Sequence, residues 1–263
     1  MIRNVAVVST GSVQIRPQHA RRDGSPLLWW LLTSRVWTAP RPINVYVIEH
    51  SDGLVLFDTG QDRSSVTDPA YFPGGLVGYL YRRLARFTIA PGETLTAQLA
   101  SIGYDIADVH TVVLSHLHQD HIGGLPELGH ARIVVSAAEW ASLGRPGALL
   151  NGLMRKHIEL PGLRWDTDPA ADLLGDGTLT LVPTPGHTPG SLSLLLRQDG
   201  MPPMLFVGDL TYDVDLLESG DVPGVGRRAE LQRSSELVGE LRRQHPSLLM
   251  LAAHDPAAAA MLA

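Results

Sequence analysis

The stretch HLHQDH, residues 116–121, follows the apolar run VVLS at 112–115 and precedes IGG at 122–124. Three imidazoles and a carboxylate therefore stand where a core strand would end. His116 and His118 lie two residues apart and point to one face of an extended chain. Asp120 and His121 follow on a chain that the glycines at 123 and 124 allow to bend sharply. Such converging nitrogen and oxygen donors favour one or two borderline metal ions over a row of surface histidines.

Three further donor residues follow strand-like runs later in the chain. His187 lies in the turn TPGHTPG at 184–190, Asp209 follows the run 204–208, and His254 follows the run 248–253. Independent strands that each end in a ligand-type residue are not expected by chance. The sequence therefore predicts a metal site that joins these residues to the 116–121 cluster.

Composition narrows the class of protein. The chain has 263 residues, of which 44% are apolar and 18% charged, so it can build a full core. We expect residues 1–263 to form a single domain. The net charge is -6 and no basic run is long enough to follow a phosphate backbone, so we expect no nucleic-acid partner. Because cysteine is absent, nitrogen and oxygen atoms must hold any metal.

The N-terminal region lacks the marks of a membrane segment. The apolar run LLWWLL at 27–32 is much shorter than the ~20 residues that span a bilayer, and the start of the chain does not have the pattern of a signal peptide. We therefore expect a cytoplasmic protein without a membrane partner. The arginines at 82, 83 and 86 indicate a solvated basic face.

Hydrophobic patterns predict the scaffold. Helices are expected at 94–102, where Gly103 is the stop, and at about 229–243. Ser136 and Glu139 have the spacing of a capping box at the start of a short helix. Residues 61–90 are expected to form a loop with one short helical piece, and residues 144–178 to be irregular. Strands are expected at 5–8, 43–49, 54–58, 111–115, 132–135, 179–182, 192–196, 204–207 and 248–251.

Taken together, the motifs resemble those of the metallo-β-lactamase superfamily. The HxHxDH run, Gly-His at 186–187, Gly-Asp at 208–209, His254 and the upstream FDTG at 57–60 occur in the order of that family. The resemblance implies an α+β fold, a four-layer αβ/βα sandwich of two mixed β-sheets flanked by helices. It places metals in the cleft at one edge of the sheets.

The same resemblance implies a ligand set of two divalent ions. The first ion would be bound by His116, His118 and His187. The second would be bound by Asp120, His121 and His254, with Asp209 as the bridge. Asp58 would orient a ligand histidine without binding metal. Zinc is the expected metal, although iron, manganese and cobalt accept the same donors.

The reaction is indicated by Tyr212, three residues after Asp209. This spacing resembles the quorum-quenching N-acyl homoserine lactone lactonases, as does the pair His254-Asp255. The absence of cysteine argues against the lactamases proper, which usually carry one at the position of Asp209. The resemblance implies that hydroxide held between the metals attacks the lactone carbonyl. Tyr212 would stabilise the oxyanion, and Asp120 would pass a proton to the leaving alkoxide, so these two are the predicted catalytic residues.

Other functions stay open at this point. A phosphotriesterase would share the ligands, and so would a thioester hydrolase of the glyoxalase II type, whose helical glutathione-binding domain we do not expect after His254. Outside enzymes, the alternative is a metal-binding module without catalysis. The early tryptophan-rich segment favours a homodimer. Apolar side chains near the expected cleft could hold an acyl chain: Leu28, Trp29, Trp30, Trp37, Tyr71, Phe72, Leu76 and Tyr79.

Overall fold

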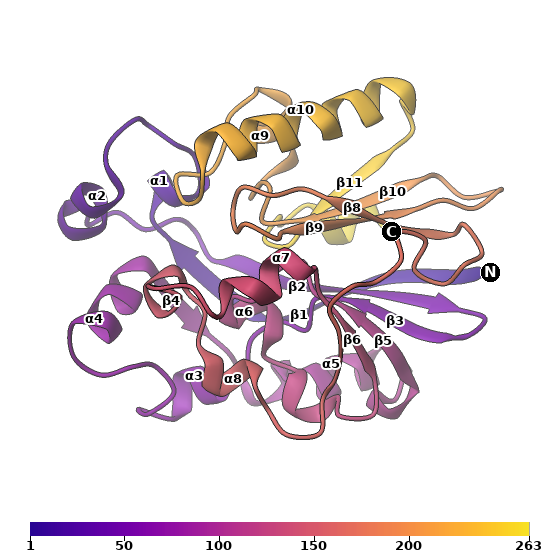
Figure 1. Ribbon diagram of the computed structural model, residues 1–263, viewed down its shortest axis with the longest axis horizontal. Coiled ribbons are helices and arrows are strands. Elements are labelled where there is room, and N and C mark those ends of the chain that lie inside the picture. The colour runs from indigo at the N-terminus through magenta and orange to yellow at the C-terminus, as the bar shows by residue number, and fades with distance from the viewer. Residues whose placement is uncertain (263) are drawn as a thin grey trace.

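The computed structural model describes residues 1–262, in which two β-sheets lie face to face (Figure 1). The order of strands is β4-β1-β2-β3-β5-β6-β7 in the larger sheet and β11-β10-β9-β8 in the smaller one. The strands are β1 (Ile2–Ile15), β2 (Arg41–His50), β3 (Gly53–Phe57), β4 (Ala85–Thr88), β5 (Val109–Val113), β6 (Arg132–Val134), β7 (Arg164–Asp166), β8 (Leu179–Pro183), β9 (Leu192–Leu196), β10 (Met204–Gly208) and β11 (Leu249–Ala252). The α-helices are α1 (Pro17–Ala20), α2 (Leu27–Thr33), α3 (Ser64–Thr67), α4 (Gly75–Leu84), α5 (Leu95–Ser101), α6 (Gln119–Ile122), α7 (Ala137–Ser142), α8 (Arg155–Ile158), α9 (Val214–Glu218), α10 (Arg228–Gln244) and α11 (Ala258–Met261).

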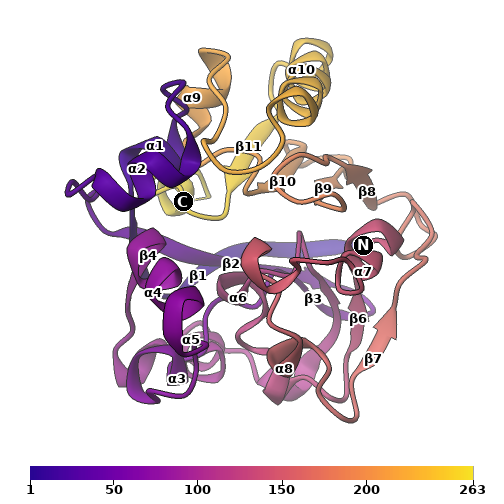
Figure 2. The same cartoon turned by 60° about the vertical axis from the view of Figure 1, so that its left-hand side comes forward.

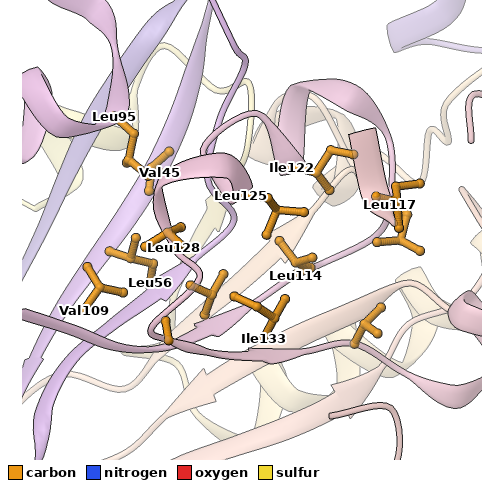
Figure 3. Close-up of a cluster of buried hydrophobic side chains, with 14 of the residues drawn as sticks. Val45, Leu56, Leu95, Val109, Leu114, Leu117, Ile122, Leu125, Leu128 and Ile133 are labelled. Atoms are coloured by element: carbon orange, nitrogen blue, oxygen red, sulfur yellow. The ribbon is translucent and has the colours of Figure 1, made fainter. Parts of the chain in front are cut away.

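The larger sheet is buried on both faces, as the alternation along β2 demonstrates. Val45 and Val47 pack with Leu95 of α5 in an outer core, part of which is drawn in Figure 3. Tyr46, between them in sequence, points the other way and packs against Phe206 of β10, with ring centroids 4.9 Å apart. Because successive side chains of a strand face opposite sides, one apolar run serves both cores.

The smaller sheet is covered on its outer face by α9 and α10 (Figure 2). Leu231 and Val238 of α10 pack against Leu205 and Val207 of β10. The layers are therefore helix, sheet, sheet and helix, which confirms the predicted four-layer αβ/βα sandwich.

The N-terminal strand is longer than the pattern at 5–8 predicted. β1 continues to Ile15 through an irregularity between Ser9 and Ser12, where Gly11 has φ +107°. A side chain at Gly11 would lie 2.6 Å from the carbonyl oxygen of Thr88. Glycine therefore lets the strand bend and pair with β4, which the sequence did not reveal because β4 is a short edge strand.

Residues 61–90 and 144–178 hold more structure than expected. The first contains α3, α4 and β4, and the second contains α8 and β7. The arginines at 82 and 86 are exposed, as the interpretation of a solvated face requires, and Arg86 lies over the ring of Trp37. The interpretation is wrong for Arg83, which is partly buried and donates to the carbonyl oxygens of Leu31, Leu32 and Ser34 at the end of α2. Helix-terminal carbonyls need such donors.

Among residues 1–262, no helix combines the length and the apolar character that crossing a bilayer would require.

Candidate metal centre

The predicted ligands come together where strands of both sheets end. β3 and β5 are parallel, so the chain after each emerges at the same edge of the larger sheet. In the smaller sheet β10 and β11 are parallel, and β8 runs in the same direction because both β8 and β10 are antiparallel to β9. The seven predicted ligands form three overlapping groups with donor atoms within 4.8 Å of one another: His116, His118 and His187; His116, His121 and Asp209; Asp120, His121 and His254.

One group consists of three histidines. Nδ1 of His118 lies 3.0 Å from Nε2 of His116 and 3.1 Å from Nε2 of His187. Nε2 of His118 lies 2.8 Å from the carbonyl oxygen of Asn151, which can only accept a proton. His118 therefore carries its proton on Nε2 and turns the Nδ1 lone pair toward the other two rings. This is the trio expected for the first ion.

The second group lies beside it. Nε2 of His254 is 3.6 Å from Oδ2 of Asp120, and Nε2 of His121 is 3.9 Å from Oδ1 of Asp120. Nδ1 of His254 donates to the carbonyl oxygen of Pro42 over 2.9 Å. This hydrogen bond places the proton of His254 on Nδ1 and leaves the lone pair of Nε2 free to bind a metal ion.

Asp209 lies between the two groups with one oxygen toward each. Its Oδ2 is 3.5 Å from Nε2 of His187, and its Oδ1 is 3.4 Å from Nε2 of His254 and 3.5 Å from Nε2 of His121. Within residues 1–262, the buried atoms Oδ1 of Asp209 and Nε2 of His121 have no hydrogen-bond partner. Buried polar atoms without partners are costly, and a cation between them would satisfy both.

The protonation states suit a cation. Burial, reinforced by the neighbouring histidines, holds the pKa values of His116 and His187 well below the usual range, so both rings are neutral at pH 7. For Asp209 burial acts to raise the pKa, but His121, His254 and His187 outweigh it and hold the pKa well below its usual range. Neutral imidazoles and an ionised carboxylate are the forms that bind metal, so His116, His187 and Asp209 suit divalent ions. Against the effect of burial, the charges of Asp58 and Asp209 raise the pKa of His121 well above its usual range, so an ion bound there would displace a proton.

Asp58 supports the centre, as the sequence predicted. Its Oδ2 accepts from Nδ1 of His121 over 2.8 Å, and its Oδ1 accepts from the backbone N–H of Ser115 over 2.7 Å. Its backbone is the one non-glycine site with positive φ, 63°, among the described residues. This strained conformation aims the carboxylate at His121, which leaves Nε2 of His121 for an ion.

Glu139 is a supporting residue that sequence reasoning missed. The expected capping box is half formed, because Ser136 accepts from the backbone N–H of Glu139. The carboxylate of Glu139 does not bond back. It is fully buried and accepts from the N–H groups of Leu117 and Gly190, each over 3.1 Å. Glu139 thus links the loop of His116 and His118 to the loop of His187.

The glycine pair after the histidine loop has a different role from the one predicted. Gly123 and Gly124 have ordinary φ values of -61° and -83°, so no sharp bend depends on them. A side chain at Gly123 would lie 2.1 Å from the backbone nitrogen of Asp62, and one at Gly124 would lie 2.3 Å from Leu95. The pair is therefore required for close packing under the centre.

Tyr212 lies next to the bridging carboxylate. Its hydroxyl is 2.8 Å from Oδ2 of Asp209 and 2.9 Å from Nε2 of His19, and its ring is buried and stacked on His254. Burial and the charge of Asp209 raise the pKa of Tyr212 well above its usual range, so the phenol keeps its proton. His19 was not predicted, since no local pattern distinguishes it from any other isolated histidine.

The apolar side chains proposed for an acyl chain divide into two sets. Trp30 and Tyr71 are buried, Phe72 is partly buried against Tyr71, and Trp37 has the guanidinium of Arg16 3.6 Å from its ring centre. Leu28 and Trp29 on α2, and Leu76 and Tyr79 on α4, are exposed. The two helices contact each other, so the exposed side chains lie on adjoining elements.

Comparison with known proteins identifies the family. The profile of the Metallo-beta-lactamase superfamily matches residues 38–254, a span that includes the residues of this centre from Asp58 to His254. The chain belongs to the metallo-β-lactamase superfamily. Among curated proteins it is similar to the N-acyl homoserine lactonase AttM of Rhizobium radiobacter, with 32% identity over 222 residues that cover 82% of each chain.

Solved structures agree on the fold. The chain is similar to a variant of AiiA from B. thuringiensis with N-decanoyl-L-homoserine bound at the active site, with a TM-score of 0.79, 22% identity, and coverage of 97% of this chain and 94% of that one. It is also similar to AidC, a dizinc quorum-quenching lactonase in complex with a product, with a TM-score of 0.63, 18% identity, and coverage of 97% and 90%. The predicted family and fold are thus confirmed.

Proposed function

We propose that the protein is a metal-dependent hydrolase that opens the ring of N-acyl homoserine lactones or related lactones. The observation that carries this proposal is the position of Tyr212, whose hydroxyl lies 2.8 Å from the carboxylate between two groups of metal donors. The curated relatives named as N-acyl homoserine lactonases support it.

The centre would hold two zinc ions. We assign His116, His118 and His187 to one ion, Asp120, His121 and His254 to the other, and Asp209 to both, as the three donor groups suggest. Bound divalent ions supply Lewis acidity and lower the pKa of water enough to give a nucleophile at neutral pH.

Two side chains of the protein would stabilise the negative charge on the substrate and supply the proton to the leaving oxygen. Hydrolysis adds one water to the ring ester: the bond between the acyl carbon and the ring oxygen breaks, and that oxygen takes up a proton. Tyr212 is placed to donate to the carbonyl oxygen as negative charge develops there. Asp120, whose side chain is 16% exposed, can reach an entering substrate and carry the proton to the leaving oxygen.

The competing activities have less support. The named relatives favour lactones over the phosphotriesters and thioesters considered from the sequence. A module without catalysis would need no buried tyrosine hydroxyl at the bridging carboxylate.

The test is a parallel assay of purified protein on an N-acyl homoserine lactone, a phosphotriester and a thioester. We expect the lactone to be cleaved fastest, and Tyr212→Phe to lower kcat by about 10²-fold with metal content unchanged. Tyr104→Phe is the matched control, because that hydroxyl bonds to Glu49 away from the centre. Unchanged kinetics in Tyr212→Phe would remove Tyr212 from the mechanism, and a faster phosphotriester or thioester reaction would replace the proposed substrate.

Three broader expectations stay predictions: that residues 1–263 form one domain, that the protein is cytoplasmic, and that it is a homodimer. The exposed side chains of Leu28, Trp29 and Leu32 on α2 are the surface on which a dimer would be sought. Light scattering of the purified protein, with Trp29→Ser as the variant, tests the dimer.

A further inference from the structure

His19 is the only side chain besides Asp209 that hydrogen-bonds the hydroxyl of Tyr212 among residues 1–262. It comes from α1, the short helix that follows β1, and is 193 residues away from Tyr212 in sequence. The residue is 7% exposed, and its ring meets the ring of Tyr212 edge to face, with centroids 5.2 Å apart. It belongs to none of the metal-donor groups found in the described part of the chain.

The direction of these hydrogen bonds follows from proton counting. A phenol has one proton, and Oδ2 of the ionised Asp209 can only accept, so Tyr212 donates to Asp209. The phenol oxygen then accepts from His19, which must carry its proton on Nε2. Nδ1 of His19 is buried and has no partner within residues 1–262, so a proton on Nδ1 would make no hydrogen bond.

The surroundings keep His19 in this neutral form. Burial lowers its pKa to about 4, against the opposing effect of Asp209 and Asp120. A neutral imidazole has one N–H. In His19 that N–H is directed at Tyr212 and at no other group in the described chain.

We propose that His19 is a positioning residue for Tyr212. His19 donates its Nε2–H to the phenol oxygen and so orients the phenol, whose O–H can then turn from Asp209 to the substrate. The inference rests on the proposed function. When Tyr212 turns its O–H to the developing oxyanion, its own oxygen gains negative charge, and the hydrogen bond from His19 strengthens. His19 thus acts on the reaction through Tyr212.

A purely structural His19 is the alternative, because its ring also lies 6.3 Å from that of Trp30 in a packed region. A structural residue would affect folding, and its loss would matter whether or not Tyr212 has a hydroxyl. A positioning residue would affect kcat only while that hydroxyl is present.

The experiment compares His19→Leu, which fills similar space without a donor, with His19→Gln, whose amide can donate from nearly the same position. We expect His19→Leu to lower kcat about tenfold, the effect of one hydrogen bond, with little change in KM or bound metal. His19→Gln should recover most of the loss. In a Tyr212→Phe background, His19→Leu should cause no further loss. His130→Leu, at an exposed histidine, is the matched control.

Two kinetic outcomes would overturn the proposal. One is an equal loss from His19→Leu with and without the Tyr212 hydroxyl. The other is a His19→Gln variant as slow as His19→Leu while both remain folded and metal-loaded.

A spectroscopic readout separates this proposal from the proposed function. In protein with ¹³Cζ-labelled tyrosine, the Tyr212 resonance, identified by its loss in Tyr212→Phe, should shift in His19→Leu and return in His19→Gln. If the wild type opens no lactone but the resonance behaves this way, the proposed substrate fails and the hydrogen bond from His19 to Tyr212 stands. If the wild type is a lactonase and the resonance is unmoved, the role of His19 fails alone.

Discussion

The loop from 116 to 121 and the segment from 16 to 37 both reach the candidate metal centre. The backbone of the loop is held by negatively charged side chains, and that of the segment by positively charged ones. Around the loop, the carboxylates of Asp58 and Glu139 accept from backbone N–H groups. Around the segment, Arg16 and Arg83 donate to backbone carbonyls, including those of Val36 and Ser34.

The difference has an electrostatic reason. The buried carboxylate of Asp58 orients the ring of His121, whereas that of Glu139 holds the backbone of the loop, and both negative charges favour a cation at the centre. The guanidinium of Arg83 has a different role, because it donates to the last carbonyls of α2, which lack partners within the helix. We infer that the loop is organised for metal before an ion binds, whereas the segment is organised by packing and delivers one hydrogen bond, from His19.

Metal removal should have the largest effect, and it should act on the loop at 116–121 much more than on the segment at 16–37. We expect chelation to abolish lactone hydrolysis and to lower stability by about 4 kcal/mol relative to protein with free ion at 1,000 times its Kd, with recovery on adding Zn²⁺. Hydrogen exchange should quicken in residues 116–121 and stay unchanged at 27–33. Equal acceleration in both regions would show that the segment also depends on the ions.

The packing of the segment is tested by two adjacent tryptophans. Trp30 is 2% exposed and Trp29 is 65% exposed. Trp30→Ala should cost about 3–5 kcal/mol, because it opens a cavity, and Trp29→Ala should stay within about 0.5 kcal/mol, as urea unfolding would measure. Similar losses from both would contradict the burial described for α2.

The support of the loop is tested by Asp58→Asn. An amide cannot accept from His121 and Ser115 as the carboxylate does, so metal affinity or activity should fall about 10–100-fold. Asp166→Asn is the control, since that carboxylate pairs with Arg132 at a partly exposed site of the same sheet. Wild-type metal titration curves for Asp58→Asn would mean that the ring of His121 is held by packing alone.

The smallest expected effect is the loss of folding stability at acid pH that His19 causes. His19 has a pKa of about 4 in the folded protein and about 6.5 in the unfolded chain. Between these pH values the unfolded chain binds a proton at His19 and the folded protein does not. Stability is therefore lost as pH falls from about 6.5 towards 4. In metal-free protein, the drop between pH 7.5 and pH 5 should be about 2 kcal/mol smaller in His19→Gln than in the wild type. Equal drops in denaturant unfolding would refute the depressed pKa.

Local signals were sufficient for much of the fold, and they named the seven side chains whose donor atoms the structure brings together. The strands that carry the centre are apolar runs with clear ends. His116, His187, Asp209 and His254 come within four residues of a strand end, and Asp120 and His121 lie in the short helix α6 that follows β5. Edge strand β4 and the three-residue strand β7 were missed because ARFT and RWD lack an apolar run, whereas the equally short β6, with RIV, was detected by its adjacent β-branched residues. Helix α4 was underestimated because its glycines and aromatic residues obscure a helical pattern.

The sequence alone determined which side chains could bind metal, because the spacing within 116–121 and the donors after later strands are properties of neighbouring residues. Only the tertiary structure decided how those ligands are held. Asp58 could be named as a support, but its partner His121 could not, and Glu139 and His19 were not foreseen. Their hydrogen bonds join residues from 22 to 193 positions apart, and contacts between distant residues leave no trace in local patterns because they form only when the sheets pack together.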